Sequence, residues 1–170
     1  MLRAGEPLQH CYIVGKLELL KLSTDDTYCP YPITIENCQL DYLEGIQLQY
    51  QWPITLRHCH FNRADFAFAY FLQGLLIEDC AFEGYLDFQA GGHNKPGYAV
   101  RLLRNTFQGF VNFFDCWYEA DVQIKGNDFQ GETNLLSFAV NYMEFNVRPC
   151  IERNTGHLYR NDEGERPADY

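Results

Sequence analysis

The chain has 170 residues, and its 23 acidic residues against 13 lysines and arginines give it a formal charge of −10. This length predicts one domain whose core needs no disulfide or metal, and an apolar fraction of 46% excludes an acidic disordered chain. No apolar run approaches the roughly 20 residues of a membrane span, the first residues do not resemble a secretory signal, and the negative charge repels phosphate backbones. We therefore expect a cytoplasmic protein with no membrane partner and no direct nucleic-acid partner.

The N-terminal region differs from the rest of the chain. The first dozen residues are expected to cover the open end of a repetitive fold, because a regular pattern starts only after them. Residues 17–22, with the sequence LELLKL, predict a first strand. Residues 23–32 are rich in Asp, Thr and Pro, which predicts a loop that leaves the core.

From residue 33 an eight-residue template recurs five times. Positions 1, 3 and 8 of the template carry apolar side chains, and position 6 carries a small Cys or Asn. The column at position 6 consists of Cys38, Cys59, Cys80, Asn105 and Asn127. Its steps are 21, 21, 25 and 22 residues, and the loop at residues 91–97 accounts for the longest step.

A second copy of the template lies between successive members of the first. It is clearest at Val111, Phe113, Cys116 and Tyr118, which are offset by 11 residues from the neighbouring copies. Its weaker members are Ile46/Leu48, Phe66/Phe68/Phe71, Leu86/Phe88 and Leu135/Phe138/Val140. Each period therefore contains two short strands.

These patterns predict how the strands are arranged. Positions 1 and 3 lie on one face of a strand, and the shift to positions 6 and 8 requires a corner between them. The period predicts an all-β fold, a single-stranded parallel β-helix (solenoid) of about six coils of 21–22 residues with irregular capping ends. Gly84, Gly109 and Gly131 share one template position, as a turn with positive φ would require. An antiparallel sandwich or barrel is the alternative for such short strands, but it does not explain the matched columns.

Charged residues at the outward template positions support the same register. Opposite charges become neighbours on consecutive coils if position 4 stacks on position 4 and position 5 on position 5. The residues concerned are Glu36, Arg57 and Glu78 at position 4 and His58, Asp79 and Arg104 at position 5.

The C-terminal part departs from the template. Phe145, Val147 and Cys150 predict a last, atypical strand, and the residues after it are polar. We therefore expect a β-helix domain with its N-terminal cap over residues 1–156 and a flexible polar tail over residues 157–170.

The segments of the form C/N-x-F-x-G, the segment Ala64-Asp65-Phe66 and the coil of 20-odd residues resemble right-handed parallel β-helix and pentapeptide-repeat proteins. The resemblance covers about residues 33–140 and implies a right-handed solenoid. The coil is not a strict multiple of five residues, so it departs from the pentapeptide pattern. The resemblance implies a fold rather than an activity, although some acidic pentapeptide-repeat proteins act as DNA mimics on enzymes such as gyrase.

The cysteines and histidines predict no metal centre. The seven cysteines are expected to be free thiols in a reducing compartment. His58 and His60 point away from Cys59 in a strand, so these three residues cannot share one tetrahedral zinc site. Cys116 has acidic neighbours that suppress its thiolate, which predicts a packing role. Nucleotide-binding motifs are absent, and we expect neither a metal nor another cofactor.

The remaining candidate for function is the surface. The second template directs Tyr70, Phe114 and Trp117 outward, close to Asp115 and Glu119 and to the loop with His93 and Lys95. Exposed aromatic residues on a flat sheet often mark an interface, because they bury much apolar area at a low entropic cost. We therefore expect a non-enzymatic interaction module with an acidic, aromatic-bearing face, whose partner is another protein or a second copy of this chain. Coverage of these residues by the terminal segments is the structural alternative.

An enzymatic function remains as a second hypothesis. Polysaccharide lyases and hydrolases built on β-helices place acidic side chains on one outer sheet. Asp87, Asp115, Glu119 and Asp121 fall on or next to the second strand series and would supply such carboxylates. Acidic residues on an outer sheet are more often a solvated face, so we expect no catalytic site.

Overall fold

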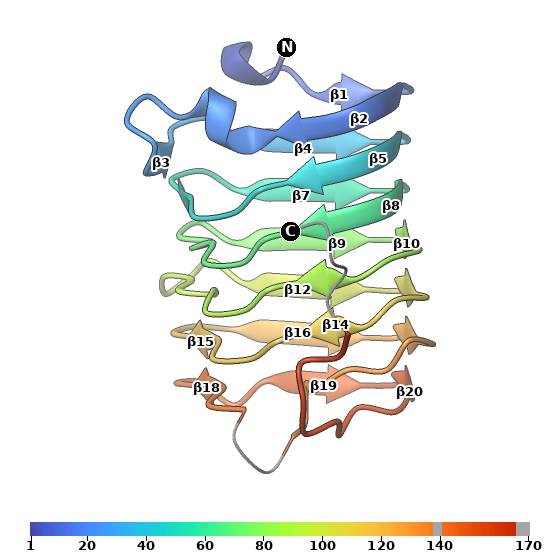
Figure 1. Cartoon of the computed structure of the whole chain (residues 1–170). Helices are drawn as coiled ribbons and strands as arrows, with labels where there is room; N and C mark the ends of the chain where they lie inside the picture. The colour runs from blue at the N-terminus through green and yellow to red at the C-terminus, as the bar shows by residue number, and fades with distance from the viewer. Residues whose placement is uncertain (138–140, 166–170) are drawn as a thin grey trace.

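The computed structural model describes residues 1–137 and 141–165 and shows a parallel β-solenoid of about five complete coils (Figure 1). Its most regular side is a sheet of seven parallel strands in the order β1-β4-β7-β9-β12-β16-β19. The strands are β1 (Leu8–Gln9), β4 (Ile33–Glu36), β7 (Ile54–Arg57), β9 (Leu75–Glu78), β12 (Val100–Leu103), β16 (Val122–Lys125) and β19 (Cys150–Glu152). The all-β solenoid predicted from the repeat is confirmed.

The coil has four sides, each built from short parallel pairings between neighbouring coils. The strands β2 (Tyr12–Glu18), β5 (Gln39–Glu44) and β8 (His60–Asp65) cover two sides in the first coils. In the later coils, one of these sides contains β10 (Ala81–Phe82), β13 (Thr106–Phe107), β17 (Asp128–Phe129) and β20 (Thr155–Gly156). The other side contains β11 (Leu86–Asp87) and β14 (Val111–Asn112). The fourth side contains β3 (Tyr28–Cys29), β6 (Gln49–Tyr50), β15 (Trp117–Tyr118) and β18 (Glu144–Phe145), joined by single bridges. Each copy of the sequence template thus supplies two sides.

The Cys and Asn residues at position 6 form a single file inside the stack. The backbone N–H of Cys80 donates to Oδ1 of Asn105, and that of Asn105 donates to Oδ1 of Asn127, both at 2.9 Å. Cys11 and Asn154 extend the file by one coil at each end, over steps of 27 residues. The expected column is confirmed. Its two outer members were not predicted, because the end coils are longer than the repeat.

Aromatic and aliphatic residues fill the rest of the interior. Phe61, Phe82, Phe107 and Phe129 stack on consecutive coils with ring centroids 4.8–5.2 Å apart. All four rings are buried. Offset stacking of this kind adds to the apolar area that each ring removes from water.

The corners carry the positive φ angles that the glycine column was expected to carry. Position 5 is left-handed on successive coils, with φ between 50° and 55° at Asn37, His58, Asp79 and Arg104. Gly84, Gly109 and Gly131 lie in one file as predicted, but the reason is close approach. A Cβ on Gly109 would lie 2.2 Å from the carbonyl carbon of Gly84. The expectation of a positive-φ turn at these glycines is therefore wrong.

The outward charges form the expected ion pairs between coils. Arg57 lies 3.6 Å from Glu36 and 3.0 Å from Glu78. Arg104 lies 2.6 Å from Glu78 and 2.9 Å from Asp79. These contacts confirm the register from residues that were not used to set it.

Two other expectations need correction, and a third lies outside the described residues. Phe68 is not an inward member of the second template, because it has a φ of 58° at a corner and is 49% exposed. Residues 17–22 form the end of β2 and a 3-10 turn, Leu19–Leu22, rather than one strand. Phe138 and Val140 lie outside the described residues.

The two ends of the chain lie against the stack. A 3-10 turn, Leu2–Ala4, precedes β1 at the N-terminal end. Residues 157–165 hydrogen-bond to earlier coils, with Thr133 N–H donating to His157 O and Tyr85 Oη donating to Glu163 O. The described part of the expected flexible tail, residues 157–165, thus makes hydrogen bonds to the β-helix domain. Within the described residues, no helix is long and apolar enough to cross a membrane.

Candidate functional site

A groove of 510 Å³ opens at the corner before the fourth side of the solenoid. We call it the aromatic groove. It is lined by Phe68, Tyr70, Ala90, His93, Asp115, Trp117, Tyr142 and Glu144. Four of these residues had been predicted to form a binding face, namely Tyr70, His93, Asp115 and Trp117.

Two parallel columns of residues build the aromatic groove. The first is a corner column in which Phe68, Ala90, Asp115 and Tyr142 have φ between 51° and 58°. Backbone bonds from Phe68 N to Gln89 O, from Ala90 N to Phe114 O and from Asp115 N to Asn141 O fix its members on consecutive coils. Ala90, between Phe68 and Asp115, has the smallest side chain of the column.

The second column lies on the fourth side, where Tyr70 pairs with Gly92 and Gly92 pairs with Trp117. Gly92 has a φ of 108°, and a Cβ there would lie 2.4 Å from the carbonyl oxygen of Trp117. Only glycine fits this position without a shift of the backbone. It lets the following residue, His93, place its ring between those of Tyr70 and Trp117.

Ring contacts and hydrogen bonds hold this second column in place. The ring centroid of His93 lies 4.0 Å from that of Tyr70 and 5.4 Å from that of Trp117. His93 Nδ1 lies 3.0 Å from Oε1 of Glu119, and Trp117 Nε1 donates to Asn146 Oδ1 at 3.0 Å. The groove is therefore preorganised, and less side-chain entropy would be lost when a ligand binds.

The groove presents exposed aromatic surface. Trp117 is 43% exposed, and Tyr142 is 67% exposed. The described terminal residues thus leave these two side chains open to solvent. Tyr70 and His93 are half-buried by their mutual stacking.

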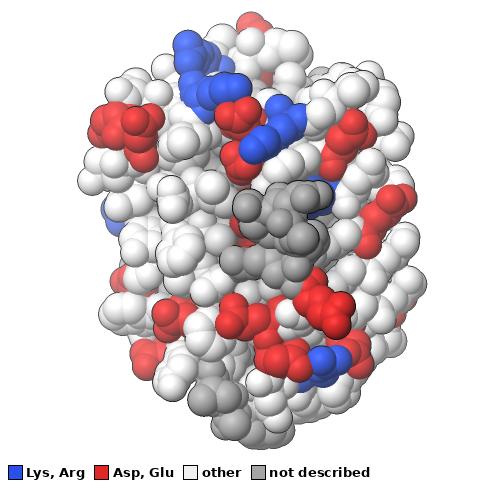
Figure 2. Space-filling view, in the orientation of Figure 1, with Lys and Arg blue, Asp and Glu red and all other residues white. Residues whose placement is uncertain are grey.

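The electrostatic character of the groove is acidic. Its described lining includes the carboxylates of Asp115 and Glu144 and no lysine or arginine. Residues 111–145 contain six acidic residues and a single lysine, Lys125. This segment therefore carries half of the formal charge of the chain. On the face seen in Figure 2, most Lys and Arg atoms lie over the N-terminal coils, whereas Asp and Glu predominate over the C-terminal coils.

The other predicted binding residues lie beside the aromatic groove or away from it. Glu119 reaches the groove through its hydrogen bond to His93. Phe114 is half-buried and packs edge-on against Tyr142, with ring centroids 5.9 Å apart. Lys95 lines a different depression with Trp52.

Sequence reasoning missed four residues of the groove, namely Phe68, Ala90, Tyr142 and Glu144. Asp115 occupies position 5 of the clearest second-template copy, and the equivalent positions one and two coils earlier are Ala90 and Phe68. Extending that position through the coils would have identified the corner column. Glu144 pairs with Trp117 only through the longer last coil.

The four carboxylates of the enzymatic hypothesis do not converge on one site. Asp87 is not on the outer face, because it is fully buried, and its Oδ1 accepts from Gln89 N at 2.9 Å and from Asn112 Nδ2 at 3.0 Å. Among the four, only Asp115 lines the aromatic groove, while Glu119 is bonded to His93 and Asp121 is exposed outside it. The four carboxylates of this hypothesis therefore do not line one groove.

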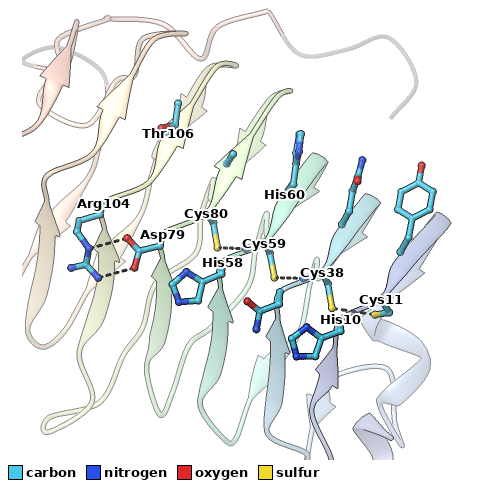
Figure 3. A pocket seen from close by; sticks show the side chains of 14 residues that line it. His10, Cys11, Cys38, His58, Cys59, His60, Asp79, Cys80, Arg104 and Thr106 are labelled. Carbon is cyan, nitrogen blue, oxygen red and sulfur yellow. Dashed lines mark hydrogen bonds and ion pairs between the residues drawn. The ribbon is translucent and has the colours of Figure 1, made fainter.

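A second groove, which we call the cysteine groove, follows the corner between the seven-stranded sheet and the next side. It has a volume of 950 Å³ and spans several coils. Figure 3 shows Cys11, Cys38, Cys59 and Cys80 in a row, with His10 and His58 on one side of it and His60 on the other. Its described lining also contains the ion pair of Arg104 with Asp79.

The histidines of this groove do not form a metal centre with the cysteines. Cys59 is buried while His58 is exposed, and His60 Nε2 lies 2.9 Å from Glu83. In the parts of the chain that the structure describes, no group of three or more His, Cys, Asp or Glu is placed to hold a metal ion.

Cys116 is a packing residue. It is fully buried, and its Sγ donates to the carbonyl oxygen of Phe88 at 3.0 Å. Burial raises the pKa of its thiol to about 12. A thiol of this kind stays protonated near neutral pH and is a poor nucleophile.

No protein-family model, no curated protein and no solved structure matches this chain. The function must therefore be argued from the chemistry of the grooves themselves. Of the two, only the aromatic groove combines exposed aromatic faces with carboxylates and has no lysine or arginine in its described lining.

Proposed function

We propose that this chain is a non-enzymatic interaction module whose aromatic groove binds a basic segment of a partner protein. The observation that carries the proposal is the composition of the groove. It presents the rings of Phe68, Tyr70, Trp117 and Tyr142 beside two carboxylates, and its described lining contains no lysine or arginine.

The chemistry of such a groove favours a cationic side chain. A guanidinium or ammonium group within about 6 Å of a Trp or Tyr ring gains about 0.5–2 kcal/mol from the ring quadrupole. The carboxylates of Asp115 and Glu144 lie in the same lining and attract the same charge. An arginine suits the site best, because its planar group stacks on a ring while its N–H groups donate to a carboxylate.

A basic partner fits this face better than a second copy of the chain does. In a symmetric dimer formed through the groove, the acidic faces of residues 111–145 would meet each other. Such a contact brings like charges together and costs free energy. A homodimer stays an alternative outcome, and light scattering distinguishes it from a monomer.

DNA mimicry is the more specific form of this proposal, and it follows from the resemblance to pentapeptide-repeat proteins. A DNA mimic presents a line of unpaired carboxylates along its length. Here Glu36, Glu78 and Asp79 on the regular sheet side are paired with Arg57 or Arg104. The charge pattern therefore favours local docking at the aromatic groove over mimicry along the whole rod.

The enzymatic alternative is tested separately. Turnover of an acidic polysaccharide that is abolished by Asp115→Ala would favour an enzyme over a binding module. We further propose that the module works in a reducing compartment such as the cytoplasm, because all seven cysteines are free thiols.

The binding proposal is tested with fluorescein-labelled oligo-arginine and a citrulline peptide of the same length as the neutral probe. We expect the arginine peptide to bind in fluorescence polarisation, and Trp117→Ala to weaken its binding about tenfold, as expected when a buried anchor is removed. Trp52→Ala is the matched control, because Trp52 is 50% exposed in a different depression. Equal affinity for both peptides, or equal losses in both variants, would overturn the proposal.

A further inference from the structure

We propose that Cys11 and Cys38 are a dithiol site that a hydroperoxide oxidises to an intramolecular disulfide, which locks the N-terminal coil onto the stack. This site is separate from the aromatic groove, and the inference does not depend on the proposed binding function. It rests on the contact of the two sulfur atoms, on the opening of the cysteine groove to solvent and on the backbone pairing around the two residues.

The two thiols are in contact across neighbouring coils. Sγ of Cys11 lies 3.1 Å from Sγ of Cys38, and both cysteines are free (Figure 3). Backbone bonds on each side hold them level with each other, from His10 N to Glu36 O at 3.2 Å and from Gln39 N to Cys11 O at 3.0 Å. Neighbouring strands are about 4.8 Å apart, which lies within the Cα separation that a disulfide spans.

Cys11 differs from the other cysteines of the file in its access to solvent. It is half-exposed in the cysteine groove, whereas Cys38, Cys59 and Cys80 are only 3–4% exposed. Cys150 is also half-exposed, but it begins β19 and lies outside the file. A small oxidant in the groove therefore meets Cys11 first and finds a second sulfur next to it.

The two cysteines take different roles in the reaction. Burial and the contact with Cys11 raise the pKa of the Cys38 thiol to about 11, so Cys38 is protonated near neutral pH. Its Sγ lies 3.2 Å from Glu36 O, a backbone acceptor. We assign Cys11 as the residue that is oxidised first and Cys38 as the residue that resolves the intermediate.

The chemistry with hydrogen peroxide is balanced. The thiolate of Cys11 attacks one oxygen, the O–O bond breaks, and the sulfur becomes a sulfenic acid while the departing hydroxide takes up a proton to form water. The sulfur of Cys38 then attacks the sulfur of Cys11, the S–O bond breaks, and a second water leaves with the proton of the Cys38 thiol. Two thiols lose two electrons in total, and one peroxide is reduced to two waters.

The disulfide would form at the N-terminal end of the solenoid, where the strands have a neighbour on one side only. It closes a loop of 27 residues and ties the segment before β2 to the segment before β5. The strands β1 and β2 lie at the end of the stack and have a neighbouring coil on one side only. We expect the oxidised protein to protect the backbone amides of β1 and β2 more strongly from hydrogen exchange.

The test treats the reduced full-length protein with a small excess of hydrogen peroxide and identifies the products by mass spectrometry. We expect loss of two hydrogen atoms and a cross-link between the peptide with Cys11 and the peptide with Cys38, formed at least tenfold faster than any other pair. Cys29→Ser and Cys150→Ser are the controls, and both should leave the cross-link unchanged.

A second variant separates the two steps of the reaction. Cys38→Ser keeps a donor toward the carbonyl of Glu36 but removes the resolving sulfur, so a sulfenic acid should accumulate at Cys11 and react with dimedone. In the wild-type protein the same label should be at least tenfold weaker. A wild-type protein that forms no Cys11–Cys38 cross-link, or that pairs its cysteines as randomly as the denatured chain does, would overturn the proposal.

Discussion

Asn105 and Asn127 lie one coil apart inside the solenoid, and Nδ2 of Asn105 donates to Oδ1 of Asn127 at 3.0 Å. The same Nδ2 donates to the carbonyl oxygen of Ile77 at 2.9 Å. Each amide thus satisfies a backbone group and also links its own coil to a neighbour. Because the two residues are only 1% exposed, no solvent replaces a bond that is lost.

Replacement of Asn105 by Leu should therefore destabilise the protein by a few kcal/mol. The larger apolar side chain overpacks the corner and leaves Cys80 N–H without its acceptor, and each defect costs about 1–3 kcal/mol. Urea unfolding measures the loss. Arg101→Leu, at an exposed position of the same coil, is the control and should change the stability by less than about 0.5 kcal/mol. An unchanged midpoint for Asn105→Leu would contradict the register.

Asp87→Ala should also destabilise the fold, by about 1–3 kcal/mol, because it removes the carboxylate that accepts from the part-buried Gln89 N–H and from the buried Asn112 amide. Thermal unfolding followed by circular dichroism tests this prediction. Asp121→Ala removes an exposed carboxylate and should have little effect. Equal stability of the two variants would show that Asp87 has no structural role.

Two glycines of the corners, Gly109 and Gly126, should differ in how well they tolerate a larger side chain. Gly109→Ala would place a Cβ 2.2 Å from the carbonyl carbon of Gly84, so we expect a loss of about 3 kcal/mol or more. Gly126, unlike Gly109, has a positive φ, but a Cβ there would lie 3.6 Å from Arg104 Cγ, and the equivalent position one coil earlier is Arg104 itself. Gly126→Asn should therefore change the stability by less than about 1 kcal/mol. Denaturant midpoints of both variants test this contrast.

The ion pairs of Arg104 predict a dependence of stability on pH. The hydrogen bonds from Arg104 lower the pKa of Glu78 below its ordinary 4.5 and that of Asp79 below its ordinary 3.8. A carboxylate with a lowered pKa in the folded state stabilises fully above its unfolded pKa, and this stabilisation is lost as the pH falls through the folded pKa. Arg104→Met should thus lower the stability at pH 7 slightly, because exposed ion pairs stabilise a fold only weakly.

The same variant should lose its difference from the wild type in acid. Urea unfolding at pH 7 and at pH 2 measures both differences. Arg101→Met is the matched control, because Arg101 is exposed on the same coil. A difference between Arg104→Met and the wild type that persists at pH 2 would show that packing of the Arg104 stem, and not its charge, stabilises the stack.

Much of the fold follows from the sequence because side chains of one column stack on each other. Cys38, Cys59 and Cys80 recur every 21 residues, and this spacing alone gives the length of a coil. The end coils have 27 residues, so Cys11 and Asn154 do not match the period and were missed. The sequence predicts which residues face the lumen wherever successive coils have similar lengths.

The candidate site was predictable only in part. Trp117 was expected to point outward by the alternation of the strand, and it is 43% exposed. The pairing of Trp117 with Glu144 depends on a coil whose length does not match the repeat. Phe68 was assigned to the interior because its apolar character suits a core, yet its corner position has a positive φ that turns the side chain to solvent. Hydrophobicity alone does not distinguish these two environments.

The most direct test of the account is to follow the fluorescence of Trp117 while a basic peptide binds. The chain has two tryptophans, so Trp52→Phe leaves Trp117 as the only indole reporter. Titration of this variant with an oligo-arginine peptide should change the Trp117 emission to a saturating value, and added salt should reverse the change. The Trp117→Phe variant, which retains Trp52, should show no such change. A response of Trp52 alone, or of neither tryptophan, would contradict the assignment of the aromatic groove as the binding site.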